Sequence, residues 1–247
     1  MGADHSITRI PTDTELITID LLVYQITTQT SPSTSTSSNH PTPTPTPTPS
    51  SSTTSTSSLL KRLWNSLIVH PSDKYMSDFQ PIHPIWQTIG FQSPNPSLDL
   101  RAGGTLALSQ LVYFAETYNH VCREFLMTSV PPHSSSKTIP PPKPPNRDAF
   151  PFALVSINVT YNLANLFNLT KPTFDHSSSH QSYWRLFKST THYNDLYVFM
   201  FKLTAQLWSE SNATLMDFAE VMGNALESFH TLLNSGPSSI LDLISWR

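Results

Sequence analysis

Cysteine, glycine and charged residues are all scarce in this sequence of 247 residues. The single cysteine, Cys122, excludes an intrachain disulfide and favours a reducing compartment. Because Cys122 lies in an apolar stretch with helical spacing, we expect a buried structural thiol rather than a reactive one. Charged residues make up only 13% of the chain and form no long basic run, so the sequence has no electrostatic footprint for general nucleic-acid binding.

Long apolar runs and a secretory signal are missing as well. No window reaches the roughly 18 consecutive apolar residues that a membrane-spanning helix needs, so we expect a cytoplasmic protein. The first residues fit the pattern for N-myristoylation of Gly2, with Ser6 at the required position. A single acyl chain without a basic patch binds membranes only marginally, so Gly2 would allow at most a reversible peripheral association.

Proline, by contrast, is abundant, and much of it falls in two tracts. Residues 1–58 are rich in Ser, Thr and Pro and include an alternating Pro-Thr run at 41–49. Such a composition buries too little apolar surface to offset the entropy of ordering, so we predict a mostly disordered N-terminal extension. Within it, residues 15–26 are apolar and β-branched; they fit a short strand or a helical turn and could dock onto the main domain.

The second tract, at 129–147, predicts a Pro-rich loop inserted into the ordered part of the chain. Its IPPPKPP run at 139–145 has polyproline character and could bind an SH3 or WW domain. The alternative is a plain solvated loop, which the same composition also explains.

From residue 59 to 247, apolar spacing predicts one all-α domain, a bundle of six or seven helices. Thr214 and Asp217 match a capping box that opens one helix, and Gly236 followed by Pro237 is typical of its end. The helices are expected at 59–69 after a Ser57 or Ser58 cap, from Gly104 to about Met127, and at 151–169, 191–210, 214–234 and 240–246.

Motifs for intrinsic hydrolysis are absent, since the sequence has no G-x-S-x-G elbow, no H-E-x-x-H and no P-loop. The chain therefore does not look like a GTPase or an ATPase itself. His176 and His180 have a spacing that could bind a metal on a helix, but the serines between them indicate a loop. We expect neither a metal site nor a cofactor.

The most distinctive segment is 86–114, which is typical of a structured loop entering a helix. Apolar anchors at its start would hold the loop rigid against the bundle. Arg101 emerges just before the helix, and Asp99, two residues earlier, could pair with it. Gly103 and Gly104 would allow the close approach of another backbone.

This segment resembles the signature of the ELMO (engulfment and cell motility) family, W-x-x-x-G-F-Q-x-x-x-P-x-x-D-x-R-G-x-G followed by a Leu-rich helix ending in Y-F. Ala102 departs from the pattern, since the family has Gly there. The stretch at 150–163, and Trp208 with 214–218, look similar to the family too, so the resemblance spans residues 60–235. The matching positions are Trp86, Gly90, Phe91, Gln92, Pro96, Asp99, Arg101, Gly104, Leu106, Leu108, Leu111, Tyr113 and Phe114.

The resemblance implies a protein that works on small GTPases. Larger members of the family are adaptors for a Rac exchange factor, whereas small members resemble GTPase-activating proteins for Arf and Arf-like GTPases, with the motif arginine as the proposed catalytic residue. This chain looks like the small type, because it has no room for the extra regions of the larger members. Arg101 would then enter a partner's nucleotide site, where such an arginine is worth about 10³–10⁵ in rate.

Two alternatives stay open from the sequence. Arg101 could instead fix the loop by pairing with Asp99, and Gln92 could either orient a water or bond the loop backbone. The domain could also be a non-catalytic adaptor that binds a small GTPase or its exchange factor, in cytoskeletal, engulfment or membrane-traffic signalling.

Overall fold

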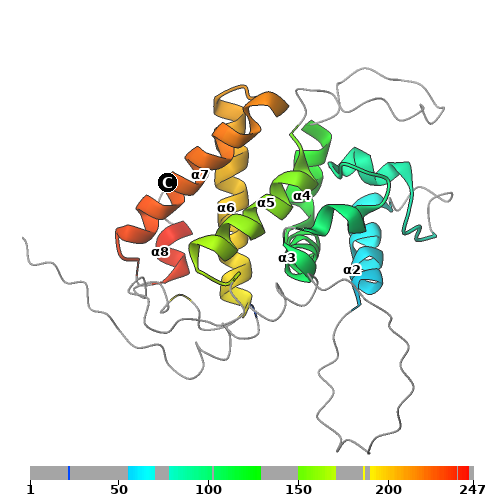
Figure 1. Cartoon of the computed structure of the whole chain (residues 1–247), viewed down its shortest axis with the longest axis horizontal. Coiled ribbons are helices and arrows are strands. Elements are labelled where there is room, and N and C mark those ends of the chain that lie inside the picture. The colour runs from blue at the N-terminus through cyan, green and yellow to red at the C-terminus, as the bar shows by residue number, and fades with distance from the viewer. Residues whose placement is uncertain are drawn as a thin grey trace, which may run out of the picture.

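The described part of the chain is helical. The computed structural model describes residues 22, 55–69, 78–101, 103–128, 150–170, 186, 190–237 and 239–244, and no strand occurs among them (Figure 1). The predicted all-α architecture is therefore confirmed. Of the apolar stretch at 15–26, Leu22 is described and is buried in the main core. Gly2, most of the N-terminal extension and the loop at 129–147 lie outside the described residues.

Short 3-10 helices lie between the α-helix that begins at Thr56 and the α-helix that begins at Gly104. None of the described helices has the length and apolar character that a membrane crossing needs. The elements are α2 (Thr56–Leu63), a π-helical turn (Trp64–Ile68), the 3-10 helices η2 (Pro84–Ile89) and η3 (Pro96–Arg101), α3 (Gly104–Thr117), α4 (Asn119–Thr128), α5 (Phe152–Leu166), α6 (Thr190–Glu210), the 3-10 turn η5 (Leu215–Asp217), α7 (Phe218–Asn234) and α8 (Ile240–Ile244).

The helices are arranged nearly in chain order from one end of the domain to the other. Helix α2 packs on α3, α3 and α5 pack on each other and on α6, and α6 carries α7 and α8. Figure 1 shows the same order, with α2 and the 3-10 helices at one end and α7 and α8 at the other. The segment 78–101 therefore lies on the α2–α3 end of the bundle.

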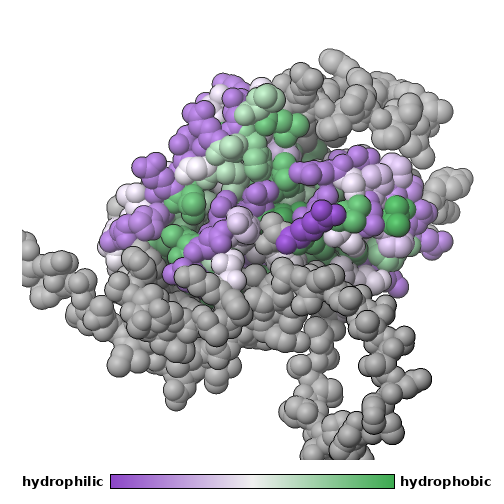
Figure 2. Space-filling view, in the orientation of Figure 1, coloured by the Kyte–Doolittle hydropathy of each residue, from purple (hydrophilic) through white to green (hydrophobic). Residues whose placement is uncertain are grey.

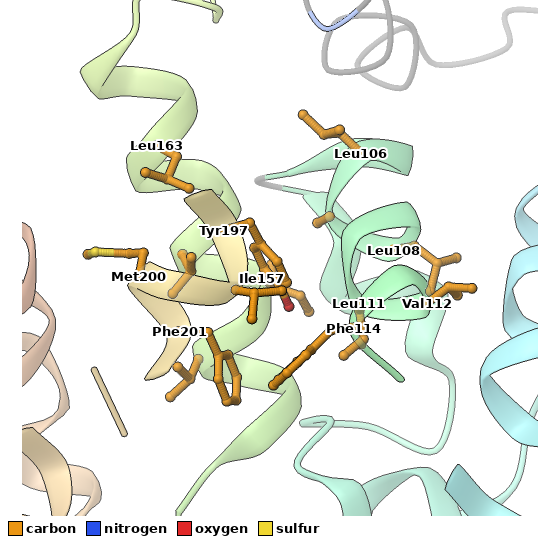
Figure 3. Packing of buried hydrophobic residues seen from close by; sticks show 14 of the residues in the cluster. Leu106, Leu108, Leu111, Val112, Phe114, Ile157, Leu163, Tyr197, Met200 and Phe201 are labelled. Atoms are coloured by element: carbon orange, nitrogen blue, oxygen red, sulfur yellow. The ribbon is translucent and has the colours of Figure 1, made fainter. Parts of the chain in front are cut away.

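The core between α3, α5 and α6 is built around aromatic rings. Phe114 lies 4.9 Å from Phe201 in an edge-to-face contact and stacks on Phe152 at 6.1 Å, measured between ring centroids. Figure 3 shows Phe114, Ile157, Tyr197 and Phe201 pointing toward one another from the three helices. Aromatic pairs at these separations add to the free energy of area burial, so α3 is firmly positioned.

Cys122 is a structural thiol, as predicted. Its side chain is fully buried, and its Sγ–H donates to the carbonyl oxygen of Phe114 at 3.5 Å. Burial raises the pKa of the Cys122 thiol to about 12. Because the thiolate is the nucleophile, Cys122 is unreactive at neutral pH.

The single helix predicted from Gly104 to about Met127 is instead two helices, α3 and α4. The chain leaves helical geometry at Tyr118 (φ −122°, ψ 41°), although no proline or glycine occurs between residues 105 and 128. Beyond the break, Asn119 Nδ2 and Arg123 Nη2 both donate to the carbonyl of Ser66, at 2.9 and 2.7 Å. The bend lets the start of α4 satisfy carbonyl groups that the end of the π-helical turn leaves open.

Replacing Arg123 with alanine should destabilise the domain by about 1–3 kcal/mol, because the part-buried carbonyls of Ser66 and Val69 each lose a charged donor and only Asn119 still donates to Ser66. Arg123 bridges two carbonyls, those of Ser66 and Val69, and its Nε also bonds the side chain of Asn119 at 2.9 Å. A cation at a helix C-terminus is further favoured by the helix dipole. Urea unfolding of the full chain would measure the loss.

Arg62→Ala is the matched control for Arg123→Ala. Arg62 forms a bidentate pair with Glu116 between α2 and α3, with N–O distances of 2.9 and 2.5 Å. Both side chains are well exposed, so this pair contributes only about 0.2–1 kcal/mol. Equal losses in the two variants would contradict a capping role for Arg123.

Helix ends match the predicted signals at the C-terminal side of the domain and differ at the N-terminal side. The capping box of Thr214 and Asp217 is confirmed, although it opens a 3-10 turn before α7. Gly236 follows α7 with φ 77° and precedes Pro237, as predicted. The cap of α2 is Ser55 rather than Ser57 or Ser58, because Ser55 Oγ accepts the Ser58 N–H at 3.2 Å.

The capping box makes part of the folding stability depend on pH. The N–H and hydroxyl of Thr214 both donate to Asp217 at 2.9 Å, and these bonds hold the pKa of the Asp217 carboxyl below its usual value. A depressed pKa in the folded state stabilises the protein above the unfolded pKa, and this stabilisation is lost as pH falls through the folded pKa. Asp217→Asn should therefore lower stability at neutral pH. In urea titrations, the difference in free energy of unfolding between the variant and the wild type should narrow once the pH is acidic enough to protonate Asp217. A gap that stays constant with pH would contradict this role.

Candidate functional site

Buried aromatic residues anchor the start of the segment 78–101. Trp86 is fully buried, and its Nε1–H donates to the carbonyl of Gln80 at 3.0 Å. Its ring meets Trp64 at 5.4 Å and Phe91 at 5.7 Å, both edge-to-face. Because Trp64 follows directly on α2, these contacts fix the 3-10 helix η2 to the end of the bundle.

Gly90 lets the chain turn against the start of α5. It ends η2 with φ +92°, in the left-handed region that favours glycine. A Cβ at this position would lie 2.8 Å from the backbone nitrogens of both Phe152 and Ala153. No side chain fits there, so the backbone of the turn at Gly90 lies directly on α5.

Asp99 ties η3 to this turn. Its Oδ2 accepts the backbone N–H of Gln92 at 2.7 Å, while the Gln92 carbonyl accepts a bond from Gln87 Nε2 at 3.2 Å. The main chain of Gln92 is therefore held, whereas its side chain is exposed and has no hydrogen bond within the described part of the chain. The two 3-10 helices thus form one braced unit.

Arg101 ends η3 with an exposed side chain. Among the described residues it has no hydrogen bond or ion pair, and Asp99 binds the loop backbone instead of the guanidinium. The other two arginines of the described ranges differ, since Arg62 pairs with Glu116 and Arg123 bridges carbonyl groups. A loop held by its own hydrogen bonds therefore presents an exposed guanidinium that no other described residue binds.

Gly103 and Gly104 are buried at the start of α3 rather than exposed beside Arg101. A Cβ on Gly103 would lie 2.6 Å from the Ala107 Cβ and 3.6 Å from the carbonyl oxygen of Ile157. Gly104 has φ 57°. The close approach that Gly103 allows is therefore to its own helix and to α5. Ala102, between Arg101 and Gly103, lies outside the described residues.

Comparison with known proteins places this segment inside a family. The model of the ELMO/CED-12 family matches residues 47–222, which include η2, η3 and the helices from α2 to α6. The chain belongs to the ELMO/CED-12 family. This family is associated with the regulation of small GTPases.

Curated relatives of the ELMO domain are mostly much longer than the matched part. The chain is 27% identical over 189 residues to ELMO domain-containing protein C of Dictyostelium discoideum, covering 73% of this chain and 27% of that protein. It is 29% identical over 164 residues to the ankyrin repeat and ELMO domain-containing protein D of the same organism, covering 66% of this chain and 11% of that protein. It is 33% identical over 137 residues to human ELMO domain-containing protein 2, covering 51% of this chain and 40% of that protein.

Hydrogen bonds between polar side chains connect the helix of the ELMO motif, α3, to α5 and α6. Thr160 Oγ1 on α5 donates to the Gln110 Oε1 on α3 at 2.8 Å, and both side chains are fully buried. The motif tyrosine, Tyr113, donates to Asp195 Oδ1 on α6 at 2.8 Å, and burial followed by this bond raises the pKa of Tyr113. These hydrogen bonds fix the position of α3 relative to α5 and α6, and α3 begins three residues after Arg101.

The structure also shows an exposed apolar residue close to Arg101 in the chain, which the motif did not point to. Leu98 is 51% exposed and precedes Arg101 by one turn of η3. The sequence signal would have been a leucine between Ser97 and Asp99 with polar residues, Asn95 and Arg101, three positions away on either side. His176 and His180 lie outside the described residues, and the part of the chain that is described holds no cluster of three His, Cys, Asp or Glu side chains suited to a metal ion.

Proposed function

We propose that this ELMO domain accelerates GTP hydrolysis by a small GTPase of the Arf or Arf-like class, with Arg101 as the catalytic residue supplied to the partner. The observation that carries the proposal is the state of Arg101 itself. Its side chain is exposed and has no partner among the described residues, while the loop that carries it is braced by Asp99 and by the seat of Gly90 on α5.

The chemistry of GTP hydrolysis fits such a residue. Negative charge on the phosphoryl oxygens must be stabilised in the transition state, and a planar guanidinium donates to two oxygens at once. An arginine already paired within its own protein would first have to break that pair. Within the described part of the chain Arg101 has no such pair to break, and a loop held by the bond between Asp99 and Gln92 loses less entropy on docking.

Single-turnover hydrolysis tests the proposal. A panel of purified Arf and Arf-like GTPases, each loaded with GTP, is mixed with the full chain in excess, and phosphate release is followed over time. We expect at least one member to hydrolyse GTP much faster with the chain than alone. The same titrations with GDP-loaded protein should show weaker binding, because the site is directed at the γ-phosphate.

The adaptor alternative predicts a different result from the same experiment. An adaptor would bind a GTPase or its exchange factor without changing the hydrolysis rate. Tight binding to a panel member with unchanged phosphate release would therefore reject the catalytic proposal for that GTPase. Binding of an SH3 or WW domain at 139–145 and lipidation of Gly2 stay predictions, since both lie outside the described residues.

A further inference from the structure

Leu98 and Arg101 share one face of the 3-10 helix η3. A 3-10 helix has three residues per turn, so side chains three positions apart eclipse each other. Leu98 and Arg101 are both exposed, whereas Pro96 and Leu100 of the same helix are buried. An apolar side chain therefore lies one turn of η3 away from a guanidinium that no other described residue binds.

A second apolar side chain lies across the neighbouring turn. The His83 N–H donates to the Pro94 carbonyl at 2.9 Å, and the Leu98 N–H donates to the Asn95 carbonyl at 3.1 Å. Ile82, which precedes His83, is 63% exposed. Figure 2 shows apolar atoms standing among strongly hydrophilic ones over this end of the domain. Hydrogen bonds to the Pro94–Asn95 turn thus fix the backbone at Leu98 and at His83, the residue after Ile82.

We propose that Leu98, together with the exposed Ile82, is buried by a GTP-loaded small GTPase when Arg101 enters its nucleotide site. This inference rests on the proposed function. Burying apolar surface favours association in proportion to the area removed from water, and an apolar side chain beside Arg101 does not compete for the hydrogen bonds of its guanidinium. The partner must then offer an apolar depression one helical turn from the point where Arg101 enters, and a GTPase with a polar surface there is a poor partner.

Leu98→Ser separates binding from catalysis. Burying the exposed half of a leucine side chain corresponds to about a three- to tenfold change in Kd. We expect the variant to raise the half-saturating concentration of the chain by that factor, while the hydrolysis rate at saturation stays near the wild-type value because Arg101 is untouched. Among the described residues, Leu98 belongs neither to the buried core clusters nor to the partly buried side chains packed against them, so thermal unfolding should change little.

Met216→Ser is the matched control. Met216 is 89% exposed and also belongs to a 3-10 turn, η5, which lies between α6 and α7. It removes a more exposed apolar side chain from a different part of the surface. We expect this variant to bind and to stimulate like the wild type.

The readouts are the Kd for a panel GTPase loaded with a non-hydrolysable GTP analogue and the rate of single-turnover hydrolysis. A loss of affinity in Leu98→Ser but not in Met216→Ser supports the inference. Equal affinity of Leu98→Ser and wild type overturns it, whatever the rates. If the wild type binds a loaded GTPase without stimulating hydrolysis, the catalytic proposal alone is overturned, since the Kd of Leu98→Ser still tests the contact of Leu98. If the chain binds no loaded GTPase, both proposals are overturned.

Discussion

Replacing Arg101 with lysine should remove most of the GTPase stimulation, a loss on the order of 10³-fold in the rate at saturation. Lysine keeps the positive charge but lacks the planar fork that reaches two phosphoryl oxygens together. Because Arg101 is exposed and has no bond within the described part of the chain, the variant should fold and unfold like the wild type. Single-turnover phosphate release at several concentrations of the chain separates the rate at saturation from the affinity.

Arg62→Lys provides the matched control for Arg101→Lys. It makes the same change in an arginine that pairs with Glu116 on the bundle instead of pointing freely from the loop. We expect full stimulation by this variant. If Arg101→Lys stimulated hydrolysis as well as the wild type did, Arg101 would have no place in the mechanism and the adaptor alternative would gain support.

Replacing Gly90 with alanine should destabilise the domain by about 2–5 kcal/mol. The left-handed backbone costs a residue with a Cβ about 1–2 kcal/mol, and forcing a methyl group into a packed site adds about 1–3 kcal/mol. The methyl group meets the backbone of Phe152 and Ala153 at 2.8 Å, and backbone cannot rotate away as a flexible side chain can. Since domains are stable by only about 5–15 kcal/mol, this single methyl group removes a large share.

Gly223→Ala carries the same substitution with the opposite expected sign. Gly223 lies in α7, is exposed, and has open space where a Cβ would stand. Alanine is favoured over glycine inside a helix by about 0.5–1 kcal/mol, so this variant should be slightly more stable. Urea unfolding of both variants at one temperature measures the contrast, and a Gly90→Ala protein as stable as Gly223→Ala would show that the turn at Gly90 does not rest on α5.

Secondary structure could be predicted wherever the signal is local. Helices α6 and α7 lie where the apolar spacing predicts them, and the capping box of Thr214 with Asp217 forms as expected. The break at Tyr118 could not be predicted, because its cause is a set of acceptors on the π-helical turn more than fifty residues earlier. Periodicity reports only neighbours within about one or two turns of the same helix.

For the ELMO motif, too, some features could be predicted from neighbouring residues and others depended on the packing of distant segments. By itself, the sequence determined that the chain is all-α, that one loop before a helix carries Arg101, and that this loop resembles a known family, because apolar spacing and motif order are properties of neighbouring residues. Only the tertiary structure decided that Asp99 binds the backbone of Gln92 instead of Arg101, and that Gly90 rests on α5 while Leu98 faces outward. Those outcomes depend on which segments pack against each other, and packing is settled by the whole chain at once.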